Sequence, residues 1–272
     1  MSVINKSYKP SLAKNETSVF NQFKALFDLN ESFVVEVGGN LSNKIVSKAG
    51  ISHWCSVDPR NFQSYSGDLT SSIRGIASSL PFPDDSVDYV FSCNAFHHIL
   101  DLQSTLKELA RVIKPGGSVY ANFGPIWSAP DGSHIENLVV ANREYNFWTD
   151  SILPSWSHLV FNQSDLFKLL AYEYEEELAM EVARFVHQTQ WINRLTYNDY
   201  RKLFRESKFK LLFLGGSSEI DYFYNPPNIN HPLSEMLEYS RLTDTIFSRY
   251  GIEKSILSVR DIEVVLNKPL VY

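Results

Sequence analysis

An apolar strand followed by two glycines constrains this chain more than any other stretch of its sequence. Residues 33–37 read Phe-Val-Val-Glu-Val, a run typical of a strand buried on both faces of a parallel sheet. Gly38 and Gly39 follow directly. Glycines at such a point let the backbone take positive φ and let a ligand approach without meeting a Cβ. The turn is therefore predicted to cradle a ligand.

A second strand, over residues 52–57, is expected to end at Asp58. An acidic side chain about 20 residues beyond a glycine turn lies where it can accept hydrogen bonds from a ribose diol. A nucleoside cofactor is therefore predicted. A dinucleotide site needs glycines at the first, third and sixth positions. Counted from Gly38, the third and sixth positions are Asn40 and Asn43, so the spacing disfavours a nucleotide-dependent oxidoreductase.

Three blocks of the sequence follow one another in a fixed order. Glu36 stands two residues before the first glycine. Residues 80–90 read LPFPDDSVDYV, and residues 106–119 read LKELARVIKPGGSV. Together these blocks resemble the class I S-adenosylmethionine-dependent methyltransferases with a type 11 methyltransferase domain. In that family they are the acidic residue before the glycine turn, the stretch before the fourth strand, and the helix, turn and fifth strand that follow.

The resemblance implies an α/β fold, a Rossmann-like seven-stranded and mostly parallel sheet with helices on both faces and an antiparallel last strand. It also implies S-adenosylmethionine as the cofactor. The residues predicted to bind the cofactor are Glu36, Gly38, Gly39, Asn40, Asp58, Pro59, Ile76, Ala77, Cys93 and Asn94.

The glycine turn and one further position depart from the family pattern. Where the family has G-x-G-x-G, this chain has Gly38, Asn40 and Ser42. Asn tolerates left-handed backbone geometry and Ser can cap the next helix, so we expect the turn to be kept. Ile76 stands where the family usually has Asp. We expect its side chain to pack on the adenine, and a backbone carbonyl near Ile76 or Ala77 to accept a hydrogen bond from the adenine amino group.

Histidines follow the fourth predicted strand, residues 87–93. The carboxyl ends of parallel strands face the ligand site in this architecture, so one histidine of the pair is expected to reach the acceptor. Adjacent helical residues point about 100° apart, which favours His98 as a catalytic residue, with His97 among the substrate-binding residues. A surface or packing role for both is the alternative. A metal site is not predicted, because two ligands on one helical face would be spaced i, i+4.

Two polar segments with aromatic residues extend the candidate site. The loop 124–134 carries Trp127 and His134, and residues 187–194 carry His187 and Trp191. An alcohol acceptor must lose a proton, and histidine is the side chain best matched to that task near neutral pH. His98 and His134 are therefore the predicted catalytic bases. The predicted substrate-binding residues are His97, Trp127, His187 and Trp191.

The chain is expected to divide into an N-terminal arm and helix (1–30), a cofactor-binding core (31–125), an inserted, largely helical cap (126–196) and a C-terminal part of the core (197–272). The last part holds a second helical insertion at 216–261, with an amphipathic helix over residues 232–250. That helix is expected either to flank the pocket or to form a homodimer contact.

Bulk properties exclude several classes. The formal net charge of −6 makes nucleic acid an unlikely partner, since neutralising phosphates takes clustered Lys and Arg. No run of about 20 apolar residues indicates a membrane span. Cys55 and Cys93 fall in predicted core strands, which suits reduced thiols and a cytoplasmic location.

The sequence therefore predicts a methyltransferase that acts on a small-molecule or sugar-like acceptor, at oxygen. Methylation of nitrogen or carbon is one alternative. A binding protein that keeps the fold without catalysis is the other, and the altered glycine turn and Ile76 motivate it.

Overall fold

The computed structural model describes residues 10, 12–13, 15–60, 65–217, 225 and 228–270. Most of the predicted N-terminal arm therefore lies outside the described residues. The chain divides into two compact units. Unit 1 comprises residues 1–124, 199–217 and 261–272, and unit 2 comprises residues 125–198 and 218–260.

Unit 1 is built on one sheet with the strand order β3-β4-β2-β1-β5-β6-β10-β9. The strands are β1 (Phe33–Val37), β2 (His53–Asp58), β3 (Tyr65–Ser66), β4 (Thr70–Arg74), β5 (Val87–Cys93), β6 (Ile113–Phe123), β9 (Lys210–Ser217) and β10 (Asp261–Asn267). Strands β4, β2, β1, β5 and β6 are parallel neighbours, and β10 is antiparallel to both β6 and β9. The predicted seven-stranded sheet is confirmed, with the two-residue β3 added at one edge.

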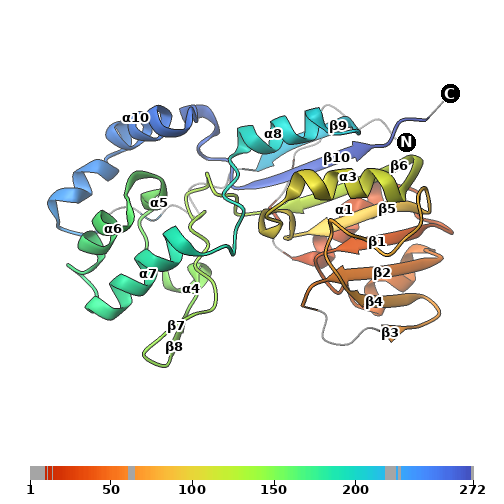
Figure 1. The fold of residues 1–272 in the computed structure, drawn as a ribbon, viewed down its shortest axis with the longest axis horizontal. Coiled ribbons are helices and arrows are strands. Elements are labelled where there is room, and N and C mark those ends of the chain that lie inside the picture. The colour runs from red at the N-terminus through yellow and green to blue at the C-terminus, as the bar shows by residue number, and fades with distance from the viewer. Residues whose placement is uncertain are drawn as a thin grey trace. The chain divides into compact units, whose positions relative to one another are not determined.

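Helices flank this sheet (Figure 1). They are α1 (Glu16–Leu26), α2 (Asn43–Val46), the 3₁₀ helices η1 (Ser47–Ala49) and η2 (Phe96–His98), α3 (Leu102–Val112) and α8 (Tyr197–Glu206). Helix α1 presents Phe20 and Phe23 to one face, where their rings lie 5.6 Å from Trp54 and 5.4 Å from Phe91. Aromatic rings dominate this part of the core because each buries a large apolar area.

Two local predictions for unit 1 need correction. Ser42 stands at the N-cap position of α2, but its side chain makes no capping hydrogen bond. The Lys-Pro-Gly-Gly segment, predicted as a turn, lies within β6, which begins at Ile113. The ladder to β5 is irregular between Val87 and Tyr89, so the strand takes up the extra residues of that segment without ending.

The described residues of unit 2 form helices and one β-hairpin. Its elements are β7 (Leu138–Val140), β8 (Arg143–Tyr145), α4 (Phe147–Asp150), α5 (Ser157–Val160), α6 (Gln163–Leu170), α7 (Glu176–Gln188), η3 (Pro232–Leu237), α10 (Tyr239–Tyr250) and η4 (Lys254–Ile256). Helices α6 and α7 lie side by side, and their residues Leu166, Leu169 and Val182 are buried in the hydrophobic core of unit 2 (Figure 1).

The hairpin and a helix break were not predicted. Ala141 and Asn142, between β7 and β8, both have positive φ, as a two-residue type I′ turn requires. No glycine marked that turn in the sequence. The helix predicted over 232–250 is divided into η3 and α10, because Glu238 takes an extended ψ of 135°.

Among the described residues, no helix is both long enough and apolar enough to cross a membrane.

Candidate active site

The turn after β1 requires glycine at two successive positions. Gly38 has φ +72°, and its N–H donates to the carbonyl of Val57 at 2.9 Å. A Cβ on Gly38 would lie 2.2 Å from the Cβ of Ala95, and one on Gly39 would lie 2.4 Å from Oε1 of Glu36. Both distances are far below van der Waals contact, so the turn leaves no room for side chains at these positions.

Glu36 links this turn to strand β2 by hydrogen bonds. Its Oε2 accepts hydrogen bonds from the backbone N–H of Leu41 at 2.9 Å, from Nε1 of Trp54 at 3.0 Å and from the hydroxyl of Ser56. Burial raises the pKa of the Glu36 carboxyl, and the three hydrogen bonds oppose that shift. Sequence reasoning missed Trp54 and Ser56. Their spacing of two residues on β2, which places them on one face, is the signal that was available.

Asp58 is the last residue of β2, and its side chain is only 6% exposed. Its Oδ1 accepts from the backbone N–H of Arg60 at 2.6 Å, and the Arg60 guanidinium lies 3.2 Å from both carboxylate oxygens. Asp58, the residue predicted to bind the ribose, is thus paired with Arg60, an arginine that sequence reasoning missed. The neighbouring Pro59 carbonyl accepts from Nε of Arg74 at 3.2 Å, which ties this turn to the end of β4.

Ile76 and Ala77 lie just beyond β4, beside the end of β2. Gly75 donates its N–H to the carbonyl of Asp58, at 3.4 Å. Ile76 is 54% exposed, an unusual position for a large aliphatic side chain, while Ala77 is partly buried. The apolar side chain of Ile76 suits the adenine of an adenosine, and the carboxylate of Asp58 suits its ribose.

These observations test whether S-adenosylmethionine suits unit 1. The glycine turn offers backbone without Cβ atoms, Asp58 offers carboxylate oxygens and Ile76 offers apolar surface, all at the carboxyl ends of parallel strands. They fit the group. The expectation of left-handed geometry at Asn40 is wrong, because Gly38 alone supplies positive φ within the segment 38–42.

The end of β5 borders the glycine turn. Ser92 donates its hydroxyl to the carbonyl of Val37 at 2.9 Å, and Asn94 has φ +50° and donates its N–H to the carbonyl of Asn122 at 3.0 Å. Cys93 between them is buried, and burial raises the pKa of its thiol, which stays protonated. Asn94 Nδ2 donates to the carbonyl of Ala13 at 2.8 Å.

His97 and His98 lie in η2, directly after this strand. His97 is 1% exposed and His98 is partly exposed. Their ring centroids are 4.1 Å apart, so the two rings contact each other despite the angle expected between neighbouring residues. The ring of Phe123, in β6, stacks on His97 at 6.2 Å.

The remaining predicted site residues lie in unit 2, where Trp127 is more deeply buried than the other tryptophan among them, Trp191. It is 6% exposed, with the Arg194 guanidinium 5.2 Å from its centroid and the ring of His158 at 4.7 Å. His187 is half-buried, and burial lowers its pKa, with Arg194 adding to the shift. Trp127, predicted to bind the substrate, is therefore packed inside the unit.

His134 and Trp191 are joined through Glu136. Trp191 Nε1 donates to Oε2 of Glu136 at 2.7 Å, and Nε2 of His134 lies 3.4 Å from the same oxygen. His134 is 4% exposed, and its ring packs on Phe147 at 4.6 Å. The structure thus brings two of the predicted residues of unit 2 together around a carboxylate that sequence reasoning missed.

His158 gives unit 2 a specific pH dependence. Its Nε2 donates to the carbonyl of Trp127 at 2.7 Å, and burial lowers its pKa to about 4. In the unfolded chain the side chain binds a proton as the pH falls through about 6.5, whereas the folded chain does so only near 4. The free energy of unfolding therefore decreases as the pH is lowered from about 6.5 to about 4. The variant His158→Gln keeps an N–H donor but cannot titrate. Between pH 7 and pH 5 we expect its free energy of unfolding to decrease by about 2 kcal/mol less than that of the wild type.

Urea unfolding of both proteins at the two pH values measures this difference. Equal losses in the two proteins would show that folding does not lower the pKa of His158.

Part of unit 1 is similar to known proteins. Residues 41–121 match the family model described as "Methyltransferase domain". The chain is 30% identical over 95 residues to the ubiquinone/menaquinone biosynthesis C-methyltransferase UbiE of Pseudoalteromonas translucida. The aligned region covers 35% of this chain and 34% of that protein. It is 50% identical over 52 residues to malonyl-[acyl-carrier protein] O-methyltransferase 1 of Coxiella burnetii, covering 19% of this chain and 18% of that protein. The chain thus spans about a third or less of the length of these curated relatives.

Solved structures extend the likeness in fold over nearly the whole chain. An S-adenosylmethionine-dependent methyltransferase from Mesorhizobium loti matches with a TM-score of 0.51 and 12% identity, covering 94% of this chain and 99% of that chain. The [4+2]-cyclase SpnF matches with a TM-score of 0.50 and 12% identity, covering 97% and 86%. Because one of these proteins is named a cyclase, the fold does not by itself determine the reaction. Residues 41–121 thus match a methyltransferase domain, and the chain has the fold of the class I S-adenosylmethionine-dependent methyltransferases, a family whose cofactor is S-adenosylmethionine.

Proposed function

We propose that this chain transfers a methyl group from S-adenosylmethionine to a small-molecule or sugar-like acceptor, at an oxygen atom. The observation that carries the proposal is the enclosed Asp58 carboxylate at the end of β2, in the strand next to the one that ends in the Gly38-Gly39 turn. A carboxylate there is suited to a ribose diol, and the turn to the rest of a nucleoside.

The bound sulfonium would supply an electrophilic methyl group, and the chain's own residues would align the acceptor with it. Alignment of reacting groups can supply roughly 7 to 11 kcal/mol of the barrier. An alcohol acceptor also needs a base. We assign that role first to His98, which is partly exposed, and second to His134, which lies beside Glu136. Unit 2, which includes the predicted cap at 126–196, would supply the acceptor-binding residues.

Two alternatives have specific support. The first is transfer to carbon, since one group of relatives is named as C-methyltransferases. The second is ligand binding without catalysis, because Arg60 already pairs with Asp58 and Ile76 replaces an acid. Turnover of S-adenosylmethionine with any acceptor excludes the second alternative, and the site of the new methyl group, read by mass spectrometry, decides the first.

Asp58→Ala tests the cofactor assignment directly. Isothermal titration should show wild-type protein binding S-adenosylmethionine and S-adenosylhomocysteine, with NAD as the negative control. Two charge-assisted hydrogen bonds are worth about 3 kcal/mol together, so the variant should bind about 100-fold more weakly.

The matched control is Asp68→Ala, which removes an exposed acid from the same unit and should leave the affinity unchanged. Arg60→Ala should not weaken binding, because the ribose would take over the hydrogen bonds that Arg60 makes with Asp58. Unchanged affinity in Asp58→Ala would refute the ribose assignment.

A further inference from the structure

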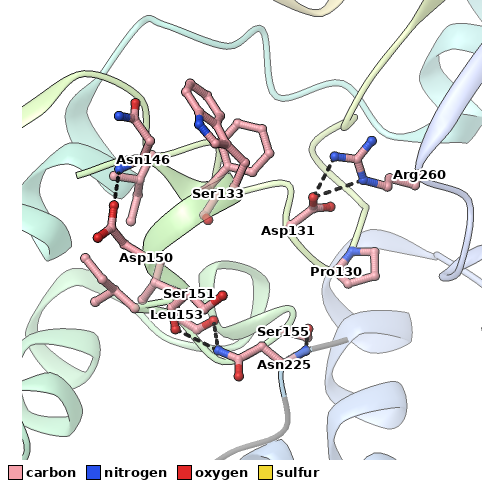
Figure 2. A pocket seen from close by; sticks show the side chains of 14 residues that line it. Pro130, Asp131, Ser133, Asn146, Asp150, Ser151, Leu153, Ser155, Asn225 and Arg260 are labelled. Atoms are coloured by element: carbon pink, nitrogen blue, oxygen red, sulfur yellow. Dashed lines mark hydrogen bonds and ion pairs between the residues drawn. The ribbon is translucent and has the colours of Figure 1, made fainter. Parts of the chain in front are cut away.

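Unit 2 contains a cavity of about 290 Å³. The loop 130–135, the segment 146–155, Asn225 and Arg260 line it. Figure 2 shows the Asp131–Arg260 pair on one side, Asn146 and Asp150 on the other, and Asn225 closing the bottom. This volume is near the lower end for ligand sites, which limits the occupant to about the size of a single small ring.

Both carboxylates of the lining already have cationic partners. Asp131 Oδ2 lies 3.0 Å from Nε and 2.9 Å from Nη2 of Arg260. Asp150 Oδ1 lies 2.8 Å from Nη2 of Arg143. Both carboxylates can therefore still accept hydrogen bonds, but their negative charges are balanced by the two arginines. A phosphate would meet carboxylates, and an ammonium group would gain little from acids that are already paired. The charge balance favours a neutral ligand.

Internal hydrogen bonds shape the lower wall before any ligand binds. Asn225 Nδ2 donates to the carbonyls of Ser151 and Leu153 at 2.9 and 2.8 Å. Its backbone N–H donates to Oγ of Ser155 at 2.8 Å, and its carbonyl accepts from the N–H of Ser155 at 2.9 Å. A wall held by four hydrogen bonds needs little ordering when a ligand enters, which favours binding.

Hydroxyls and aromatic rings complete the lining. Within the described part of the chain, the hydroxyls of Ser133 and Ser151 make no hydrogen bond, so both are available as donors and acceptors. Trp148 is 56% exposed, and the ring of Phe147 meets it edge to face at 5.0 Å. Phe147 in turn packs on His134. An exposed indole beside hydroxyl groups provides one apolar face and a polar rim.

We propose that this cavity binds a neutral polyhydroxylated ring, a monosaccharide or a cyclitol. Its C–H face would lie on Trp148, and its hydroxyls would meet Ser133, Ser151 and Asp131. The binding claim rests on unit 2 alone. Only the further step, that this ring is the methyl acceptor, rests on the proposed function.

Saturation-transfer difference NMR on the full chain, without S-adenosylmethionine, tests this claim. The probes are D-glucose, D-galactose, L-rhamnose, N-acetyl-D-glucosamine and myo-inositol, with choline and inorganic phosphate as charged comparators. We expect at least one ring to receive saturation and neither charged probe to do so. Trp148→Ala should reduce the signal at least fivefold.

Tyr172→Ala is the matched control, because it removes a ring that is 57% exposed in the same unit and outside the cavity, and it should keep the signal. Ser133→Ala should also weaken the signal with little effect on folding. Silence from all five rings, an equal signal in Trp148→Ala, or binding of choline alone would overturn the proposal. These results are independent of the titration with Asp58→Ala, so a failure of either proposal can be recognised by itself.

Discussion

Replacing Glu36 with Ala should lower the free energy of unfolding by about 3 to 5 kcal/mol. The change leaves the backbone N–H of Leu41 and the hydroxyl of Ser56 without their acceptor in the core of unit 1, and it leaves the indole N–H of Trp54 with only Oγ of Ser56, at 3.1 Å. Each buried donor that loses its partner costs about 1 to 3 kcal/mol. Because Leu41 lies in the turn, we expect S-adenosylmethionine binding to be lost as well. Urea unfolding at pH 7 gives the stability, and isothermal titration gives the affinity.

Two variants separate the hydrogen bonds from the loss of volume. In Glu36→Gln the amide oxygen can take the place of Oε2, so this protein should lose less than half as much stability as Glu36→Ala. Ser56→Ala removes one of the three donors and should lose about 1 kcal/mol. Equal losses for the Ala and Gln variants would show that the acceptor oxygen is not what holds the turn.

Gly38→Ala should destabilise unit 1 by about 3 kcal/mol or more. Part of the cost is the left-handed backbone, about 1 to 2 kcal/mol for a residue with a Cβ. The rest is the overlap with Ala95, whose Cβ would lie 2.2 Å away, and overpacking of this kind costs about 1 to 3 kcal/mol. The same overlap would displace the turn, so cofactor affinity should fall with stability.

Gly116→Ala supplies the matched control, because Gly116 has φ +87° in the same unit and, among the described residues, a Cβ there would meet only the side chain of Leu270, at 3.2 Å. It should lose about 1 to 2 kcal/mol. The double variant Gly38→Ala/Ala95→Gly should recover the overlap part, which a double-mutant cycle on urea unfolding measures. If Gly38→Ala and Gly116→Ala lose the same amount, the contact with Ala95 contributes nothing.

The sequence predicted best those features that depend on residues close together along the chain. The strand 87–93 was predicted with its observed bounds, and Asp58 does end β2, because buried β-branched runs and the residues that stop them are local signals. The pairing of Asp58 with Arg60 is just as local, but which cation occupies a carboxylate depends on rotamers that no pattern specifies.

Features that depend on tertiary contacts were missed. The loop with Trp127 and His134 was recognised, yet packing directs Trp127 inward between Arg194 and His158. The cavity needs Asn225 and Arg260, which lie far from residues 130–155 in the sequence. The hairpin β7–β8 has Ala and Asn in its turn, so the usual glycine signal was absent.

The position of β10 has a consequence for how the chain folds during synthesis. Among the described strands of this sheet β10 is the last to be made, yet it lies between β6 and β9, so that Val264 pairs with both Ala121 and Leu214. Until it leaves the ribosome, β6 has an open edge and β9 has no partner strand. The sheet of unit 1 is therefore completed only after residues 261–267 have been made, by insertion of β10 between β6 and β9. Such late, long-range pairing is slow, and it leaves a strand edge open to association with other chains in the meantime.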